Sequence, residues 1–307
     1  MSWPDCRRNA VADTIRTAQP ALGASEAAIQ AHYDISNDFY ALWLDPSMVY
    51  SCALWHVDDD ATSLQRAQQR KLDFHLETCA ATGKKRLLDI GCGWGALLER
   101  AVTHYGVDQA VGLTLSQAQA DWIARSTTAN LAVSLESWVD HVPTAPYDAV
   151  VSIGAFEHFA KVGLTSSQKI DAYRRFFLWC HKQTTNDCLL SIQSIVYENY
   201  DEQNPNPFVE EIFPESELPR LSEILAACSG LFEITRLQND RADYARTLQT
   251  WYRNLRERRN EAISMVGEQV YKKYEKYLGV FAVGFHRGTV NLTRLAARKI
   301  NAPVVNR

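Results

Sequence analysis

The sequence predicts an α/β fold in which a doubly wound, mostly parallel sheet carries helices on both faces. Three observations predict it. Short apolar or β-branched runs alternate with helical stretches, which is the arrangement that parallel strands with crossover helices require. A glycine-rich turn follows the first of these runs and opens a helix. The chain has 307 residues, of which 46% are hydrophobic, and this suffices for one large core.

Six runs are typical of buried strands because they are short and rich in apolar and β-branched residues. They are residues 86–90, 109–115, 132–136, 147–153, 188–195 and 231–237. Patterns of helical spacing separate most of the first five, over 96–105, 117–127 and 169–181. We therefore expect right-handed crossovers between neighbouring strands.

Helical segments flank this core, and we expect one domain over 1–307. Residues 1–31 are alanine-rich, and Ser63–Ala80 has the pattern of an amphipathic helix. The acidic, proline-containing stretch 197–219 predicts a lid, with a plain surface excursion as the alternative. Two helices are expected near the C-terminus, over 244–260 and 262–298. The expected parts are an N-terminal helical cap (1–80), a core (81–196), a lid or insertion (197–230) and a C-terminal strand with helices (231–307).

Charge and composition exclude several classes of function. The net charge of −4 provides no basic field for nucleic acid. No apolar run approaches the roughly 20 residues that span a bilayer, and the first residues lack the apolar part of a secretion signal. Seven scattered cysteines without a C-x-x-C pair indicate reduced thiols, and no metal-binding motif is present. We expect a cytoplasmic protein that binds neither nucleic acid nor a metal ion.

The turn LLDIGCGWGA (87–96) predicts a cofactor site. Gly91, Gly93 and Gly95 allow a sharp turn and the close approach of a ligand at the end of a strand. A dinucleotide site would need G-x-G-x-x-G and an acid at the end of the next strand, whereas this chain has G-x-G-x-G and GLTLSQAQ. Asp89, just before the turn, can face a cationic amino group. S-adenosylmethionine has an ammonium and a sulfonium group and no phosphate, so it fits better than NAD.

A carboxylate and an imidazole interrupt the apolar stretch SIGAFEHF (152–159). An unpaired carboxylate is costly to bury. Glu157 is therefore a structural group satisfied by backbone N–H groups, a metal ligand, or a base whose pKa is raised by apolar surroundings. The residues alone favour the structural interpretation. His158 is an alternative base or a hydrogen-bonding support.

Seven stretches resemble the cyclopropane fatty acid synthases, in particular the mycolic acid cyclopropane synthases. They are HYDISNDFYALWLDPSMVYSCALW (32–55), LLDIGCGWGA (87–96), VGLTLSQAQ (111–119), VVSIGAFEHF (150–159), EIFP (211–214), DYARTLQTW (243–251) and VYKKYEKYLGVF (270–281). The resemblance covers about residues 32–300. It implies a class I, Rossmann-like methyltransferase that uses S-adenosylmethionine to act on carbon–carbon double bonds.

The resemblance also implies roles for matching residues. The cofactor would meet Tyr50, Ser51, Gly91 and Gly93 at its methionine end, Thr114 and Gln119 at the ribose, and Ser137 and Trp138 at the adenine, with Asp89, Gly95 and Ile153 also in the site. The family binds a bicarbonate ion as base, and Cys52, Glu157 and Tyr244 match three of its four ligands. The family's LLHTI is LLSIQ here, so Ser191 replaces the fourth ligand, a histidine, and Gln193 replaces an apolar neighbour. These departures weaken the case for bicarbonate and for ring closure.

Extra cations occur in the connection HFAKVGLTSSQKIDAYRR (158–175), which is longer than in the family. They are usually explained as a solvated helix face. If Arg174 and Arg175 turned inward, they would suit the diphosphate of an isoprenoid substrate. A second cluster is expected to be exposed, with peripheral contact to anionic membranes as the alternative: Arg253, Arg256, Arg258 and Arg259.

The expected function is S-adenosylmethionine-dependent C-methylation of a double bond in a hydrophobic lipid or isoprenoid, with prenyl diphosphates among the candidates. Methylation leaves a carbocation that aromatic rings can stabilise and from which Glu157 assists loss of a proton. The candidate catalytic residues are Glu157, Tyr244, His158 and Cys52, and the candidate substrate residues are Tyr33, Ser191, Gln193, Arg174 and Arg175. The alternatives are a cyclopropane synthase acting on unsaturated acyl chains and an amine N-methyltransferase.

Overall fold

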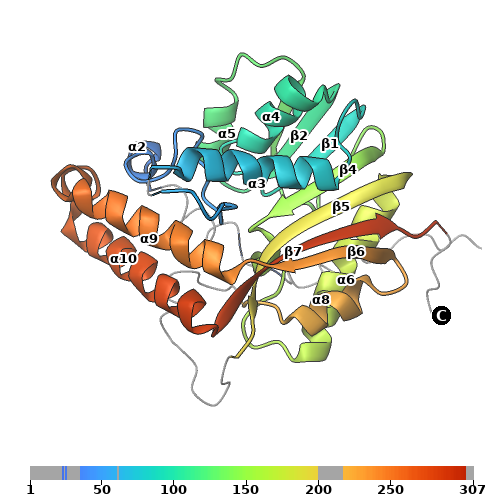
Figure 1. The fold of residues 1–307 in the computed structure, drawn as a ribbon. Coiled ribbons are helices and arrows are strands. Elements are labelled where there is room, and N and C mark those ends of the chain that lie inside the picture. The colour runs from blue at the N-terminus through green and yellow to red at the C-terminus, as the bar shows by residue number, and fades with distance from the viewer. Residues whose placement is uncertain (1–22, 24, 26–34, 61, 200–216, 302–307) are drawn as a thin grey trace, which may run out of the picture.

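One seven-stranded sheet forms the centre of the described part of the molecule (Figure 1). The computed structural model describes residues 23, 25, 35–60, 62–199 and 217–301. The strands are β1 (Arg86–Ile90), β2 (Gln109–Thr114), β3 (Leu131–Leu135), β4 (Tyr147–Ile153), β5 (Thr184–Tyr197), β6 (Phe232–Asn239) and β7 (Val290–Lys299), in the order β3-β2-β1-β4-β5-β7-β6. Strands β1 to β5 are parallel, and β7 is antiparallel to β5 and β6. The predicted α/β fold is confirmed.

Helices cover both faces of the sheet (Figure 1). α3 (Leu64–Thr78), α4 (Ala96–Tyr105) and α5 (Gln117–Ile123) lie on one face, and α6 (Ser166–Gln183) and α8 (Leu221–Cys228) lie on the other. Successive strand residues alternate between the two layers. Leu87 and Val151 pack with side chains of α3, α4 and α5, whereas Leu88 and Val150 pack with those of α6 and α8. Because both faces are buried, these strands are apolar throughout.

The expected helix over 262–298 is wrong at its C-terminal end. α10 (Arg259–Arg287) ends at Gly288, whose φ of 80° is a left-handed value that glycine adopts freely. The chain then forms β7 between β5 and β6. Leu, Ala and Arg in this stretch favour a helix, but pairing on both sides and burial of most of the strand outweigh that preference.

α9 (Arg241–Glu257) and α10 pack along each other and meet the short helix α2 (Asn37–Ala41) (Figure 1). Between them lies a cluster of buried aromatic rings, which we call the aromatic cluster: Phe39, Tyr40, Trp43, Trp94, Tyr244, Trp251, Tyr271, Tyr274, Tyr277, Phe281 and Phe285. Trp94 follows β1, and Ile195, near the end of β5, belongs to the same cluster. The cluster therefore lies at the carboxyl ends of the parallel strands, where open α/β sheets bind ligands.

Parts of three predicted segments lie outside the described residues, and in the C-terminal one these are 302–307. In the helical cap these are 1–22, 24, 26–34 and 61, which include the candidate substrate residue Tyr33. In the predicted lid they are 200–216, which include the motif EIFP. The described remainder of that lid contains α8, whose Ile224 and Ala227 share a core with Phe176 of α6. This part is a helix that covers the sheet and not an irregular loop.

No helix among the described residues is long and apolar enough to cross a bilayer. Nor do those residues bring together three side chains of the types that bind metals.

Candidate active site

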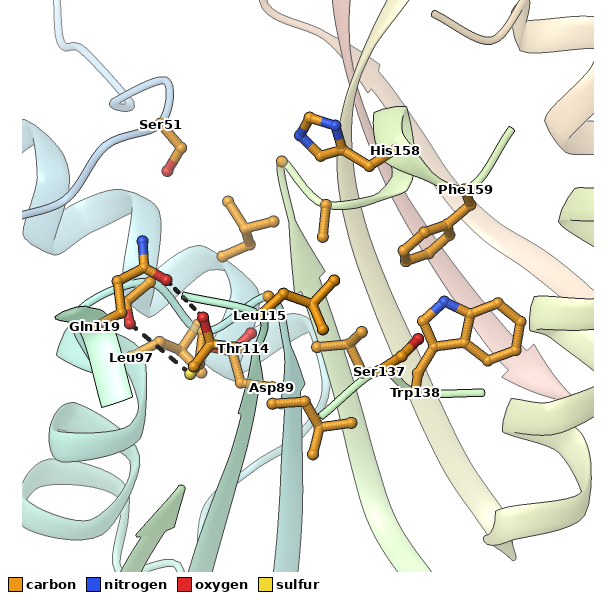
Figure 2. Close-up of a pocket in the computed structure, with 18 of the residues that line it drawn as sticks. Ser51, Asp89, Leu97, Thr114, Leu115, Gln119, Ser137, Trp138, His158 and Phe159 are labelled. Atoms are coloured by element: carbon orange, nitrogen blue, oxygen red, sulfur yellow. Dashed lines mark hydrogen bonds between the residues drawn. The ribbon is translucent and has the colours of Figure 1, made fainter. Parts of the chain in front are cut away.

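A pocket of about 950 Å³ opens at the carboxyl ends of the central parallel strands (Figure 2). Its walls come from the segments that follow β1, β2, β3 and β4 and from residues 48–51. The predicted cofactor residues that line it are Tyr50, Ser51, Asp89, Gly91, Gly93, Thr114, Gln119, Ser137, Trp138 and Ile153. Gly95 is not among the lining residues, because it forms the N-cap of α4 behind the turn.

The turn between β1 and α4 brings the backbone to the pocket. Gly91 and Gly93 have φ values of 81° and 54°, which a residue with a side chain rarely adopts. A Cβ atom on Gly91 would lie 2.5 Å from the Cβ of Ala155, whereas one on Gly93 would meet no described atom within 4 Å. Gly91 is thus required by close packing against the segment after β4, and Gly93 leaves open space for a ligand.

Hydrogen bonds orient the polar groups that follow β2. The Thr114 hydroxyl donates to Gln119 Oε1 over 2.7 Å. Ser116 is the N-cap of α5 and accepts a hydrogen bond of 3.2 Å from the backbone N–H of Gln119. Because Gln119 Oε1 is already an acceptor, its NH₂ group is the part that can donate to a ligand, and Figure 2 shows this nitrogen on the side away from Thr114.

Aromatic side chains form the opposite wall (Figure 2). The ring of Trp138 lies 5.5 Å, between centroids, from the rings of both Phe159 and Phe176. Trp138 and Phe159 line the pocket, and Figure 2 shows Ser51 and Gln119 across from them. A rigid apolar surface of this kind suits a planar purine ring.

Two buried charged side chains belong to the wall near residues 48–51. Asp89 is 3% exposed, and its Oδ1 has no hydrogen-bond partner among the described residues. Burial raises the pKa of this carboxyl to about 7. Lys71 of α3 is 1% exposed and donates to the Ser51 hydroxyl over 2.8 Å. From the same helix, Gln68 donates to the backbone carbonyls of Val49 and Ser51 and so fixes this segment.

Glu157 lies on the single turn η1 (Phe156–His158) that follows β4. Its Oε1 accepts a hydrogen bond of 2.6 Å from the Ile195 N–H, and its Oε2 has no partner within the described chain. Burial raises the pKa of the carboxyl to about 7, against the opposing effect of that hydrogen bond. Glu157 does not line the pocket, but His158 does. Burial lowers the pKa of His158 to about 4, so its imidazole is neutral at pH 7.

Tyr277 of α10 lies near Glu157 and forms a hydrogen bond with Tyr50. Burial raises the pKa of Tyr277 to about 12, a hydrogen bond with Tyr50 opposes this shift, and the nearby Glu157 carboxyl reinforces it. Tyr50 lines the pocket. Tyr50 and His158 thus line the pocket, whereas Glu157 and Tyr277 are buried and do not line it.

Tyr244 is part of the aromatic cluster, Cys52 is buried in the same hydrophobic core, and neither lines the pocket. Burial raises the pKa of the Cys52 thiol to about 12, which disfavours a nucleophilic thiolate. The ring of Tyr244 packs on Phe285 with 4.5 Å between centroids. Ile195, whose N–H binds Glu157, belongs to the same cluster, so both residues are in the region behind the pocket.

Ser191 and Gln193 belong to a buried network around His75 of α3. The Nδ1 of His75 is 2.8 Å from the Ser191 hydroxyl, and its Nε2 is 3.4 Å from Gln193 Oε1. Gln193 Oε1 also accepts a hydrogen bond of 2.9 Å from Arg294. Since arginine only donates, this Gln193 atom is the oxygen, His75 Nε2 carries the proton, and Nδ1 accepts from Ser191. Burial first, and then the neighbouring Lys71 and Arg294, hold the pKa of His75 well below its usual value.

Arg294 of β7 is fully buried and completes this network. Besides Gln193, its guanidinium forms an ion pair with Asp240 and donates to the backbone carbonyls of Cys52 and Ala53. Every part of the guanidinium is thus engaged by the protein. The network ties β5 and β7 to the segment that carries Ser51 and Cys52.

The two candidate arginines of α6 do not act as the predicted pair. Arg174 donates to the backbone carbonyls of Ala227 and Ser229 at the end of α8 and does not line the pocket. Arg175 does line it, and its side chain is exposed, so it lies at the rim. The exposed arginine cluster forms ion pairs with nearby acids, namely Arg253–Glu257, Arg256–Glu275, Arg258–Glu261 and Arg259–Glu268.

Sequence reasoning missed Lys71, His75 and Arg294. A usable signal existed in the helix over Ser63–Ala80. Gln68, Lys71 and His75 recur at spacings of three and four residues, on the same face as the apolar Leu72 and Leu76, and polar groups on a buried face call for partners. Arg294 had no such signal, because its segment was expected to be helical.

Comparison with known proteins shows which family this chain belongs to. The family model described as mycolic acid cyclopropane synthetase matches residues 22–295. The chain belongs to this family. It is 36% identical over 293 residues to cyclopropane mycolic acid synthase 1 of Mycobacterium tuberculosis, covering 89% of this chain and 97% of that protein. It is also 36% identical over 291 residues to cyclopropane mycolic acid synthase MmaA2 of the same organism, covering 88% of this chain and 96% of the relative.

Solved structures of known proteins support the same family assignment. The crystal structure of mycolic acid cyclopropane synthase CmaA1 complexed with S-adenosylhomocysteine and CTAB has a TM-score of 0.81 at 35% identity, covering 91% of this chain and 99% of that one. Coclaurine N-methyltransferase, at 19% identity and a TM-score of 0.75, shares the fold. Geranyl diphosphate C-methyltransferase from Streptomyces coelicolor, at 15% identity and a TM-score of 0.64, also shares it.

This member of the cyclopropane synthase family is an S-adenosylmethionine-dependent methyltransferase. The residues of the pocket fit the cofactor. The Asp89 oxygen that has no partner among the described residues can accept a hydrogen bond from the ammonium group of the cofactor. The open space beside Gly93 leaves room for its methionine chain, and the aromatic wall suits its adenine. S-adenosylmethionine supplies an electrophilic methyl group on a sulfonium centre.

Proposed function

We propose that this enzyme adds a methylene bridge across a carbon–carbon double bond of an unsaturated acyl chain and so forms a cyclopropane ring. Family membership over most of the chain supports the reaction. A relative crystallised with the hydrophobic, lipid-like ligand CTAB supports an apolar substrate. The buried Glu157 carboxyl beside the pocket is the observation on which the proposal depends.

The chemistry requires a dry, apolar site and a base. When one alkene carbon receives a methyl group, the neighbouring carbon becomes cationic, and one proton must leave before a new carbon–carbon bond closes the ring. Tyr50 and Trp94 line the pocket and offer ring faces that stabilise the cation. Glu157 accepts the proton, directly or through a bound bicarbonate. Its raised pKa of about 7 suits a base that works near neutral pH.

A specific observation favours a second product. Ser191 stands where the family has a histidine, and its hydroxyl is engaged by His75. If this change removes the bicarbonate site, the cation loses a proton from another carbon and the product is a methylated alkene. An isoprenoid substrate in this second case would place its anionic group near Arg175 at the rim. Amine N-methylation, the third candidate, would use Glu157 to position the amine.

The substrate class is tested by incubating the enzyme with radiolabelled S-adenosylmethionine and a panel of acceptors. The panel contains monounsaturated acyl chains, prenyl diphosphates and amines, with the saturated acyl chain as control. We expect label only in unsaturated acyl chains, and fragmentation should place the new carbon at the former double bond. Label in amines, or in prenyl diphosphates alone, would overturn the proposal.

A further inference from the structure

Lys71 is a buried cation that none of the roles above uses. It projects from α3 into the wall of the pocket, is 1% exposed, and makes one hydrogen bond, to the Ser51 hydroxyl over 2.8 Å. Among the described residues no carboxylate lies within ion-pair distance of it. A lysine ammonium has three N–H donors, so two of them have no partner among the residues that the structure describes. A buried charge without a partner is costly, which indicates that a ligand supplies the missing anion.

The anion is identified by what surrounds Lys71. Asp89, on the neighbouring wall, is a buried carboxylate with an unpartnered oxygen. The pocket thus presents one buried cation and one buried anion close enough to affect each other's pKa. The methionine end of the cofactor carries the complementary pair, an ammonium and a carboxylate on one carbon atom.

We propose that Lys71, together with the Ser51 hydroxyl, binds the carboxylate of S-adenosylmethionine while Asp89 binds its ammonium group. This places α3 in direct contact with the cofactor. The inference concerns cofactor binding alone, so it holds whether the product is a cyclopropane or a methylated alkene.

The electrostatics around Lys71 agree with this assignment. The charged and titratable groups that face it are Asp45 and Cys52 of the preceding segment, His75 of its own helix, Asp89 of β1 and Arg294 of β7. Burial first, and then Arg294, lower the pKa of Lys71 to about 7, against the opposing effects of Asp45, Cys52 and Asp89. A bound carboxylate favours the charged form, so its arrival should raise this pKa and draw a proton from solvent above pH 7.

The first test compares two ligands on two proteins by isothermal titration calorimetry. S-adenosylhomocysteine has the carboxylate, and its decarboxylated analogue keeps the ammonium, the sulfur and the nucleoside. We expect Lys71→Met to weaken S-adenosylhomocysteine binding about tenfold or more, since an ionic hydrogen bond is lost, and to leave binding of the analogue within about threefold of wild type. Lys85→Met, at an exposed lysine, is the matched control. Equal loss for both ligands, or no loss for either, would overturn the proposal.

A second test needs no variant and applies even if Lys71→Met does not fold. Titrations of the wild-type protein at pH 8 in buffers of different ionisation enthalpy report the protons taken up on binding. We expect S-adenosylhomocysteine to take up more protons than the decarboxylated analogue, because only the former contacts Lys71. Both ligands carry the ammonium, so any effect at Asp89 cancels in the difference. Equal uptake by the two ligands would contradict the assignment.

Discussion

Replacing Glu157 with glutamine separates the catalytic role of this carboxyl from a structural one. Glutamine keeps an oxygen that can accept the hydrogen bond from the Ile195 N–H. It removes the group that can take a proton. A general base contributes about 10²- to 10⁴-fold to a rate, so we expect turnover to fall at least about a hundredfold while the Kd for S-adenosylhomocysteine stays close to wild type.

The same substitution, which should lower turnover, should raise stability at high pH, and this follows from the pKa of Glu157. Burial raises that pKa from 4.5 to about 7, so the folded state disfavours the ionised form. The stability that this group contributes is full below pH 4.5 and is lost as the pH rises through 7. At 1.36 kcal/mol per pKa unit, the loss is about 3 kcal/mol. Glu157→Gln should therefore be more stable relative to wild type at pH 8 than at pH 5.

Urea unfolding at pH 5 and pH 8 and product formation by mass spectrometry measure both effects. Glu198→Gln, at an exposed glutamate just after β5, is the control and should change neither. The wild-type rate should also fall about tenfold per pH unit below pH 7, as the base becomes protonated. Unchanged turnover in Glu157→Gln, or the same stability difference at both pH values, would refute the reasoning.

Two further predictions follow from the pocket. Asp89→Asn should weaken S-adenosylhomocysteine binding about tenfold or more in calorimetry, and tight binding by the variant would exclude the assigned contact. The variant should not lose stability at pH 8, because burial raises the pKa of the Asp89 carboxyl and its charge therefore destabilises the folded state. Arg174→Ala should lower the free energy of unfolding by about 1–3 kcal/mol, because two hydrogen bonds to the end of α8 are lost, and should leave kcat and KM unchanged. Arg175→Ala, at the rim of the pocket, should change KM. A change of KM in Arg174→Ala alone would reverse these roles.

The sequence predicts those parts of the molecule whose signals are local. β1 and β4 have the expected bounds because a buried parallel strand is a short apolar run between turn residues. The glycine turn is recognisable because its glycines are needed for backbone conformation and close approach. The roles of the other candidate cofactor residues came from the family resemblance, and the structure places all of them except Gly95 in the lining of one pocket.

Non-local features are harder to predict. β7 depends on pairing with β5 and β6, which no local pattern reveals. Arg174 and Arg175 are adjacent in sequence, but successive side chains on a helix point about 100° apart, so one binds α8 and the other reaches the pocket. The network of His75, Ser191 and Arg294 joins three elements that are far apart in the chain.

Isotope retention tests the central claim most directly. The enzyme is supplied with S-adenosylmethionine that carries three deuterium atoms on its methyl group and with a monounsaturated acyl chain. If a base beside the pocket removes a deuteron from the transferred methyl, the product is a saturated ring that retains two of the three deuterium atoms. A product that keeps all three, with a double bond still present, would contradict ring closure and leave the methylated alkene as the product.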